Sequence, residues 1–118
     1  MIADSCFLID LMSGDSKAIK LFETQKDFLV PAVVLTEVSR GIDDTDAFIS
    51  FLRGFVTIDI DTPVALDAAK LMQKNDKLGK PVDICDALVA SCARKYAVPI
   101  ATRNKKHFEK LDVIIQLY

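Results

Sequence analysis

The stretch DICDALVASCARKYAVPIA, residues 83–101, carries the clearest structural pattern in the sequence. Its first part is rich in Ala, begins with acids and ends with Arg94-Lys95, which is the charge order that a helix dipole favours. The apolar run at residues 98–101 follows directly and predicts a short buried strand. A helix that leads into a short buried strand is part of a βαβ unit, so this stretch favours a parallel sheet of the α/β class.

The same alternation extends over the rest of the chain. Short apolar runs predict four further strands, at residues 1–3, 28–30, 55–58 and 113–115. Helical patterns lie between them. The first, after residues 1–3, is in two pieces separated at Ser13-Gly14. Others cover residues 32–41 and 46–53, and a further one runs from Thr62 to a break at residues 77–81. Residues 102–110 are expected to form a polar turn. No repeat or linker interrupts this order, so residues 1–118 are expected to form one domain around a mostly parallel five-stranded sheet.

The composition limits the class of protein. A chain of 118 residues that is 51% hydrophobic can build a core of its own. No apolar stretch approaches the roughly 20 residues that a membrane span needs, and acids at positions 4 and 10 do not fit an export signal. The three cysteines, Cys6, Cys85 and Cys92, are an odd number without a Cys-x-x-Cys motif. These features predict a cytoplasmic protein with no membrane contact, in which Cys85 and Cys92 are small buried hydrophobes.

The formal net charge of −2 hides an asymmetry between the two parts of the chain. Residues 1–69 contain twelve acids and five basic residues, whereas residues 70–118 contain five acids and ten basic residues, so the two parts carry −7 and +5. Such a distribution points to an anionic partner or an acidic site. The alternative is that both sets of charges are simply solvated.

Several polar residues fall just after the predicted strands. In open parallel sheets, ligands bind beyond the carboxyl ends of the strands. Asp4 ends the first predicted strand, Glu37 follows the second, Asn104 follows the fourth, and Asp83 and Asp86 open the helix that leads into the fourth. Their placement predicts a cluster of carboxylates at one edge of the sheet.

Each of these acids also has a simpler explanation. Glu37 interrupts an apolar helix face, so we expect it to be mostly buried and to need a metal or a partner, and Arg40 is an available partner. Asp4 could cap the following helix, and acids such as Asp83 and Asp86 often occupy a first helical turn. His107, within the predicted polar turn, is interpreted as a local cap rather than a catalytic residue.

Converging carboxylates repel one another unless a cation holds them or some are protonated. A hard ion such as Mg²⁺ prefers oxygen ligands, binds one or two carboxylates directly and keeps several waters. It could activate a water molecule and neutralise charge on a phosphoryl group. The sequence contains neither GxxxxGK[ST] nor GxGxxG, and His107 is the only histidine available for a serine triad.

Four segments together resemble the PIN-domain nucleases, and in particular the short toxins of VapBC-type toxin–antitoxin pairs. These segments are MIADS at residues 1–5, VLTEV at 34–38, DALVASCA at 86–93 and IATRNKKHF at 100–108. Each is a weak pattern alone, but their order, their spacing and the total length agree with the family. The resemblance implies a three-layer α/β/α fold and an endoribonuclease that uses Mg²⁺ or Mn²⁺ to hydrolyse RNA phosphodiester bonds. It also implies a homodimer silenced by a small antitoxin protein.

The resemblance assigns roles to residues of this chain. Asp4, Glu37 and Asp86 match the three acidic site residues, and Asn104 stands at the fourth acidic position, where many members carry Asp. This departure removes one negative charge and weakens the case for a second metal ion, although Asp83 could compensate. Asp4 and Asp86 are expected to bind the metal, while Glu37 orients or deprotonates the attacking water. The remaining matches are supporting positions: Ser5 and Thr102 match residues that brace the acids, and Arg103, Lys105 and Lys106 are expected to hold the RNA backbone.

Two other interpretations stay open at this point. A receiver domain is an α/β domain of similar size with an acidic Mg²⁺ pocket, and Asp59 and Asp61 do follow the third predicted strand. However, a receiver domain needs adjacent acids after its first strand, where this chain has only Asp4. The chain could also be a PIN-fold scaffold that has kept the acids without the activity.

Overall fold

A parallel sheet of five short strands forms the centre of the molecule, in the order β3-β2-β1-β4-β5. The structure is a computed structural model that describes all of residues 1–118. The strands are β1 (Ile2–Ala3), β2 (Leu29–Pro31), β3 (Val56–Ile58), β4 (Ile100–Ala101) and β5 (Ile115–Gln116). All four neighbouring pairs are parallel. The predicted α/β class is therefore confirmed, and the sheet is parallel throughout.

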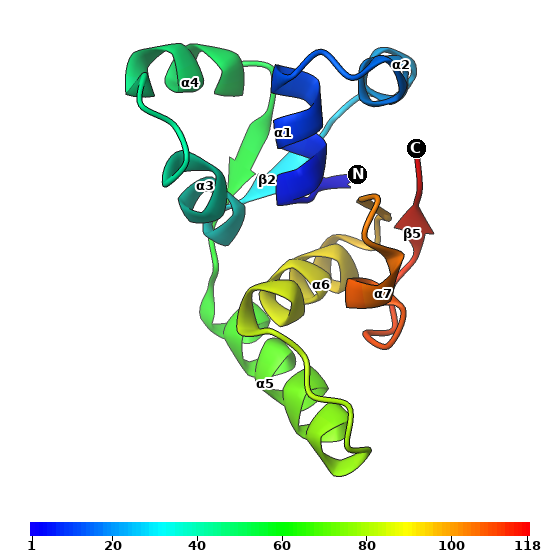
Figure 1. Ribbon diagram of the computed structural model, residues 1–118. Coiled ribbons are helices and arrows are strands. Elements are labelled where there is room, and N and C mark those ends of the chain that lie inside the picture. The colour runs from blue at the N-terminus through cyan, green and yellow to red at the C-terminus, as the bar shows by residue number, and fades with distance from the viewer.

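Seven helices surround this sheet. They are α1 (Ser5–Met12), α2 (Ser16–Thr24), α3 (Ala32–Ser39), α4 (Thr45–Leu52), α5 (Thr62–Lys77), α6 (Ile84–Tyr96) and α7 (Lys105–Phe108). Helices α1 to α4 lie together in the upper part of Figure 1, and α5 and α6 lie together in the lower part. The predicted break at Ser13-Gly14 is confirmed, because it separates α1 from α2.

The short helix α7 corrects one sequence prediction, because residues 102–110 were expected to form a polar turn. Its sequence, KKHF, is too short to show a helical period. Phe108 at its end is fully buried and fixes this single turn to the core. Consequently the residues that follow β4 are directed back towards α6 instead of extending into solvent.

The central strands explain why the core is continuous. Ile2 and Ala3 of β1 and Ile100 and Ala101 of β4 are completely buried. Strands that are covered on both faces have continuous apolar sequences, as these do. β1 is hydrogen-bonded to both β2 and β4, so whatever follows β1 lies at the middle of the sheet edge.

Aspartates begin several of the helices. The side chains of Asp15, Asp44, Asp61 and Asp83 accept hydrogen bonds from backbone N–H groups in the first turns of α2, α4, α5 and α6. Such caps satisfy donors that have no partner within the helix. Pro63 follows Thr62 at the start of α5, where a proline costs no hydrogen bond, and the helix predicted from this pair is confirmed.

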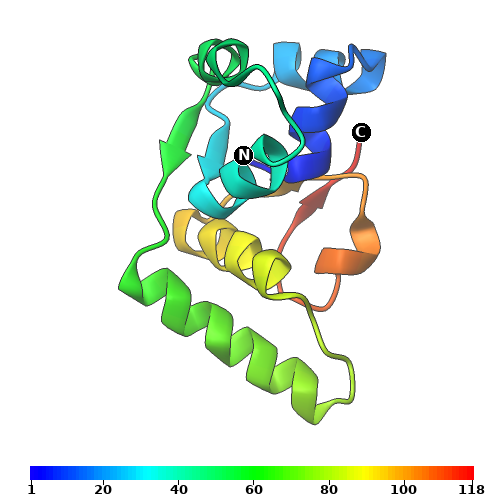
Figure 2. The ribbon, with the colours of Figure 1, turned by 60° about the vertical axis from the view of Figure 1, so that its left-hand side comes forward.

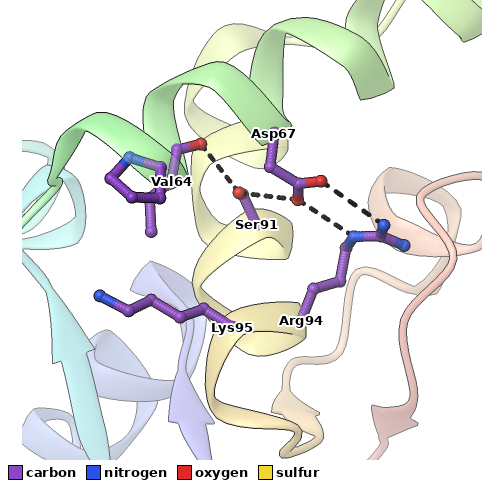
Figure 3. A pocket seen from close by; sticks show the side chains of 6 residues that line it. Val64, Asp67, Ser91, Arg94 and Lys95 are labelled. Atoms are coloured by element: carbon purple, nitrogen blue, oxygen red, sulfur yellow. Dashed lines mark hydrogen bonds and ion pairs between the residues drawn. The ribbon is translucent and has the colours of Figure 1, made fainter.

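Helix α5 is the outermost element and runs along α6 (Figure 2). A polar cluster joins the two helices, as Figure 3 shows. The hydroxyl of Ser91, whose residue is 1% exposed, lies 2.8 Å from the Val64 carbonyl oxygen and 2.9 Å from Asp67 Oδ2. Arg94 pairs with Asp67 at 3.0 Å and with Asp112 at 2.7 Å. Because each charged group in this cluster has an opposite partner, the hollow in Figure 3 is a structural joint between α5 and α6.

The strand order excludes the receiver-domain interpretation. In flavodoxin-like folds the third strand lies beside the first, which brings its acids to the central pocket. Here β3 is an edge strand and β2 separates it from β1. Asp61, which follows β3, caps α5 and pairs with Lys95 of α6.

None of the seven helices has the length and hydropathy that crossing a membrane requires.

Candidate metal and catalytic site

A polar pocket of about 280 Å³ lies beyond the carboxyl ends of β1 and β4. No hydrophobic residue lines it; its walls are formed by Asp4, Ser5, Glu37, Asp83, Asp86, Asn104 and His107. The structure thus brings together the residues that were singled out from four separate segments of the sequence. Asp4 lies between β1 and α1, Glu37 is on α3, and Asp83 and Asp86 are at the start of α6. Asn104 lies between β4 and α7.

Asp4 occupies the cap position of α1, but its carboxylate does not cap that helix. It is 4% exposed, and its Oδ2 accepts hydrogen bonds from Thr102 Oγ1 at 2.8 Å and from Cys6 Sγ at 3.4 Å. Thr102 is itself buried, and its Oγ1 accepts from the backbone N–H of Asn104 at 3.0 Å. The simple capping explanation for Asp4 is therefore wrong, and Thr102 takes the bracing position that was expected of it.

Asp86 and His107 form a pair across the pocket. His107 Nδ1 lies 3.2 Å from Asp86 Oδ2. Burial raises the pKa of Asp86 to about 6; the nearby His107 opposes this change, while Asp4 and Asp83 add to it. The interpretation of His107 as a local cap is wrong, because α7 turns the imidazole towards α6 and makes it part of the pocket wall.

Glu37 lines the pocket but is solvent-exposed, so the expectation that it would be mostly buried is wrong. Its neighbours Val34 and Val38 face the core, and Glu37 takes the side of α3 that opens towards the pocket. The pKa of Glu37 is raised by partial burial of its carboxylate and then by the charges of Asp4, Asp86 and Asp83. Arg40 opposes this increase, but the two side chains form no ion pair. The alternative of an ion pair between Glu37 and Arg40 is thus excluded.

Asp83 has a structural role as well as a place in the pocket wall. Its Oδ1 accepts from the backbone N–H of Cys85 at 2.8 Å, as expected for an acid at a helix start. Cys85 itself is half-buried, and its pKa is raised by burial and by the nearby Glu37 and Asp83. The prediction of a small buried hydrophobe is therefore confirmed for Cys92, which is fully buried, and wrong for Cys85.

A second, basic hollow of about 550 Å³ adjoins the acidic pocket. Asn104 and His107 line both, and the basic one is completed by Arg103, Lys105, Lys106 and one acid, Glu109. The two lysines are exposed and unpaired, whereas the Arg103 guanidinium pairs with Asp10 of α1. Other basic residues of the second half lie elsewhere: Lys70, Lys74 and Lys77 are on α5. Of the positive charge noted in residues 70–118, only a part lies beside the acids.

Three residues at the back of the site were missed in the sequence. Asp10 is 7% exposed and accepts from Tyr118 Oη at 2.6 Å as well as from Arg103. Cys6 lies between Asp4 and Tyr118. The one available signal was that Asp10 interrupts an apolar helix, since a buried carboxylate needs partners. Burial raises the pKa values of both Cys6 and Tyr118, so both groups keep their protons at neutral pH.

The chemistry of these donors fits a hard divalent cation. Carboxylate oxygens dominate the pocket, and burial followed by the charges of neighbouring acids raises the pKa values of Glu37 and Asp86, a cost that a cation would relieve. No three His, Cys, Asp or Glu side chains lie close enough together to hold one ion jointly. Mg²⁺ does not require such a cluster, because it commonly binds one or two carboxylates and retains several waters. The site therefore suits a partly hydrated ion.

The structure is similar to several solved toxin–antitoxin structures. A toxin–antitoxin complex from Klebsiella pneumoniae has a TM-score of 0.84 and 23% identity, over 98% of this chain and 95% of that chain. VapBC2 from Rickettsia felis, bound to a DNA fragment from its promoter, has a TM-score of 0.85 and 16% identity, over 99% and 97%. Mycobacterium tuberculosis VapC20, a toxin that cleaves the sarcin–ricin loop, has a TM-score of 0.67 and 16% identity, over 84% and 85%.

At these identities the similarity to solved structures shows the fold alone. No curated protein matches the chain by sequence. The sequence does match the family model of the PIN domain, over residues 1–114. That match extends from the first residue to the residue before β5, and includes every residue of the acidic pocket. The chain therefore belongs to the PIN domain family.

Proposed function

We propose that this PIN domain is a metal-dependent endoribonuclease and the toxin of a VapBC-type toxin–antitoxin pair. The observation that carries the proposal is the pocket in which Asp4, Glu37, Asp83 and Asp86 meet, beside a hollow lined by exposed lysines. Membership of the PIN family and the likeness to VapC-type toxin structures support a nuclease. The metal, the RNA substrate and the roles of single residues are parts of the proposal.

Asp4 and Asp86 would hold Mg²⁺ or Mn²⁺, directly or through water. Such an ion supplies a positive charge that stabilises the phosphoryl oxygens and makes a bound water more acidic. Asn104 lines the same wall without adding a charge, so the proposal is for one tightly held ion. Asp83 is the residue that could contribute to a second one.

Glu37 is proposed to orient the attacking water and to accept its proton. Its raised pKa suits a base better than an unperturbed carboxylate, because proton transfer is most effective when the pKa lies near the working pH. The water oxygen bonds to phosphorus, and the bond between phosphorus and the 3′ oxygen breaks. The 3′ oxygen takes up a proton from solvent water, and Glu37 later returns its own proton to solvent, which leaves a 5′-phosphate and a 3′-hydroxyl.

The basic hollow is proposed to hold the RNA backbone. Lys105 and Lys106 are exposed there and form no ion pair, although Glu109 lines the same hollow. The outer part of the Arg103 guanidinium can add to them, although Asp10 already engages one of its nitrogens. Contacts to phosphates position a strand without reading its sequence.

A small antitoxin protein and a second copy of the chain are the proposed partners. The relatives from Klebsiella pneumoniae and Rickettsia felis are complexes of toxin with antitoxin, which supports the first partner. Light scattering during size-exclusion chromatography tests the second: a homodimer has twice the 13.1 kDa mass of the chain. A single species of 13.1 kDa at all concentrations contradicts the homodimer.

The activity is tested with end-labelled RNA, purified protein and either Mg²⁺, Mn²⁺ or EDTA. We expect cleavage with a metal, none with EDTA, and none for Asp4→Asn. Asp76→Asn, which changes an exposed acid on α5, is the matched control and should cleave like the wild type. Cleavage that survives EDTA and Asp4→Asn would contradict the metal mechanism. RNA binding without cleavage under all conditions would instead support the scaffold interpretation.

A further inference from the structure

A line of buried polar side chains leads from Asp4 away from the pocket. Cys6 Sγ lies 3.4 Å from Asp4 Oδ2 and 3.2 Å from Thr102 Oγ1. On its other side, Tyr118 Oη lies 3.8 Å from the same sulfur and donates to Asp10 Oδ2 at 2.6 Å. The line thus connects the first strand of the sheet to a residue that follows the last strand.

The protons in this line can be assigned one by one. Thr102 Oγ1 accepts from the N–H of Asn104, so its own proton is free for Asp4 Oδ2. Tyr118 gives its single proton to Asp10. Because the Thr102 proton is taken by Asp4, the Cys6 thiol is the donor in its own contacts, and its proton can go to Asp4 Oδ2 or to Thr102 Oγ1. Both hydrogen bonds to Asp4 therefore end on the same oxygen.

The second oxygen of Asp4 is left for the pocket. Every fully buried side-chain oxygen or nitrogen in the structure has a hydrogen-bond partner. Oδ1 of Asp4 has none, so it reaches the surface of the pocket that Asp4 lines. Asp4 can therefore offer one oxygen to a cation, and the two hydrogen bonds to Oδ2 fix the rotation of its carboxylate.

Tyr118 and Asp10 hold the helix that carries this arrangement. Asp10 and Cys6 are four residues apart in α1 and lie on the same face. Arg103, the residue next to Thr102, pairs with Asp10 Oδ1, the oxygen to which Tyr118 does not donate. The Tyr118 ring also packs edge-on against Phe7, with ring centroids 5.2 Å apart. These contacts fix α1 against the segment after β4, and hence Cys6 against Thr102.

We propose that Tyr118 is a positioning residue for Asp4: its hydroxyl, through Asp10 and Cys6, holds α1 in the register in which Asp4 presents only Oδ1 to the metal. The inference rests on the proposed function, since it assigns a metal to Asp4. Groups behind metal ligands commonly change metal affinity by about ten- to a hundredfold, and Tyr118 acts from one position further away.

The test is Tyr118→Phe in the full chain, with Tyr96→Phe as the matched control. Tyr96, the only other tyrosine, lies on α6, is 42% exposed and makes no hydrogen bond through its hydroxyl. Binding of Mn²⁺ is followed by the electron paramagnetic resonance signal of the free ion. We expect Tyr118→Phe to weaken Mn²⁺ binding about three- to tenfold and to raise the Mn²⁺ concentration for half-maximal cleavage by the same factor. KM for RNA should change by less than about twofold, and Tyr96→Phe should match the wild type.

A pair of variants at Cys6 completes the test. Cys6→Ser keeps a donor for Asp4 and should bind Mn²⁺ nearly as tightly as the wild type, whereas Cys6→Ala should resemble Tyr118→Phe. Unchanged Mn²⁺ affinity in Tyr118→Phe would overturn the inference while an active wild type upholds the proposed function. An equal loss of Tm, RNA binding and Mn²⁺ binding would also overturn it, because Tyr118 would then be merely structural. A wild type that binds Mn²⁺ but cleaves no RNA would count against the proposed function alone.

Discussion

Thr102 donates a 2.8 Å hydrogen bond to Asp4, a residue 98 positions earlier in the chain. The bond joins the segments that follow β4 and β1, two neighbouring strands at which the direction of the chain across the sheet reverses. Pockets form at such points because the connections leave the two strands in opposite directions. Strand order therefore brings Asp4 beside Thr102, and the buried hydroxyl of Thr102 contributes to the geometry of the carboxylate.

Replacing that hydroxyl should affect both stability and catalysis. Thr102→Val keeps the shape but leaves Asp4 without its shorter hydrogen bond and the N–H of Asn104 without an acceptor. We expect the free energy of unfolding to fall by about 1–3 kcal/mol, the cost of leaving buried polar groups unpaired. Cleavage should fall at least about tenfold, as for other residues behind metal ligands. Urea denaturation and an RNA cleavage assay measure the two effects, and Thr102→Ser, which keeps the hydroxyl, is the control. If Thr102→Val and Thr102→Ser had the same free energy of unfolding and cleaved RNA equally well, the bracing role of the hydroxyl would be contradicted.

The raised pKa of Asp86 predicts a stability that depends on pH. The ordinary pKa of this group is 3.8, and in the folded protein it is about 6. Between these values the folded state keeps a proton that the unfolded chain has lost, so this group lowers stability as pH rises through the window. Above about pH 6 the cost is fully present, and it amounts to roughly 1–3 kcal/mol.

Asp86→Asn removes this cost, since Asn carries no charge beside Asp4, Asp83, Glu37 and His107. In EDTA, we expect the variant to be more stable than the wild type at about pH 7, and the gain to vanish by about pH 4. Urea denaturation at several pH values measures it. Asp76→Asn should show no such gain, and a gain that persists at about pH 4 would contradict the electrostatic explanation.

The lysines of the basic hollow should control the affinity for RNA and its salt dependence. Lys105→Ala with Lys106→Ala should raise KM for RNA several-fold and leave kcat almost unchanged. For single strands the logarithmic salt slope should fall by about 1.4, because each phosphate that a lysine no longer neutralises lowers it by about 0.7. Fluorescence anisotropy with labelled RNA at several salt concentrations gives the slope. Lys70→Ala with Lys74→Ala on α5 is the charge-matched control. If this control lowered the salt slope equally, RNA binding would depend on the total charge of the protein and not on the basic hollow.

The joint between α5 and α6 should be separable from the active site. Ser91→Ala removes a buried hydroxyl that binds α5, and it should lower the free energy of unfolding by about 0.5–1.5 kcal/mol. RNA cleavage should not change. Thermal unfolding and the cleavage assay are compared with those of Ser50→Ala, which alters an exposed position on α4. A loss of activity in Ser91→Ala without a loss of stability would show that the joint is coupled to the site.

The sequence predicts most of the secondary structure because its signals are local. The Thr62-Pro63 start of α5, the Ser13-Gly14 break and the apolar run of β4 each depend on a few neighbouring residues. The helix at residues 105–108 was missed, since it is stabilised by the burial of Phe108 and not by a periodic pattern. Its omission led to the wrong interpretation of His107.

The candidate site is predictable in its membership but not in its hydrogen bonds. The placement of polar residues after strands and at a helix start points to Asp4, Glu37, Asp86 and Asn104, and the family motifs add an expected role for each. What each carboxylate does depends on side-chain partners that periodicity does not reveal: Asp4 is held by Thr102, 98 residues away, and by the Cys6 thiol, and it does not cap the backbone of α1. The exposure of Glu37 depends on how α3 packs, which helical periodicity alone does not determine.

The position of β4 beside β1 also has a consequence for synthesis of the protein. β1 leaves the ribosome before the other four strands, but its neighbour β4 and the segment with Thr102 and Asn104 lie near the other end of the sequence. Until those residues emerge, Asp4 has neither its brace nor the opposite wall of its pocket. A nascent chain should therefore be inactive until synthesis of this domain is nearly complete, which for a toxic nuclease would protect the ribosome that makes it.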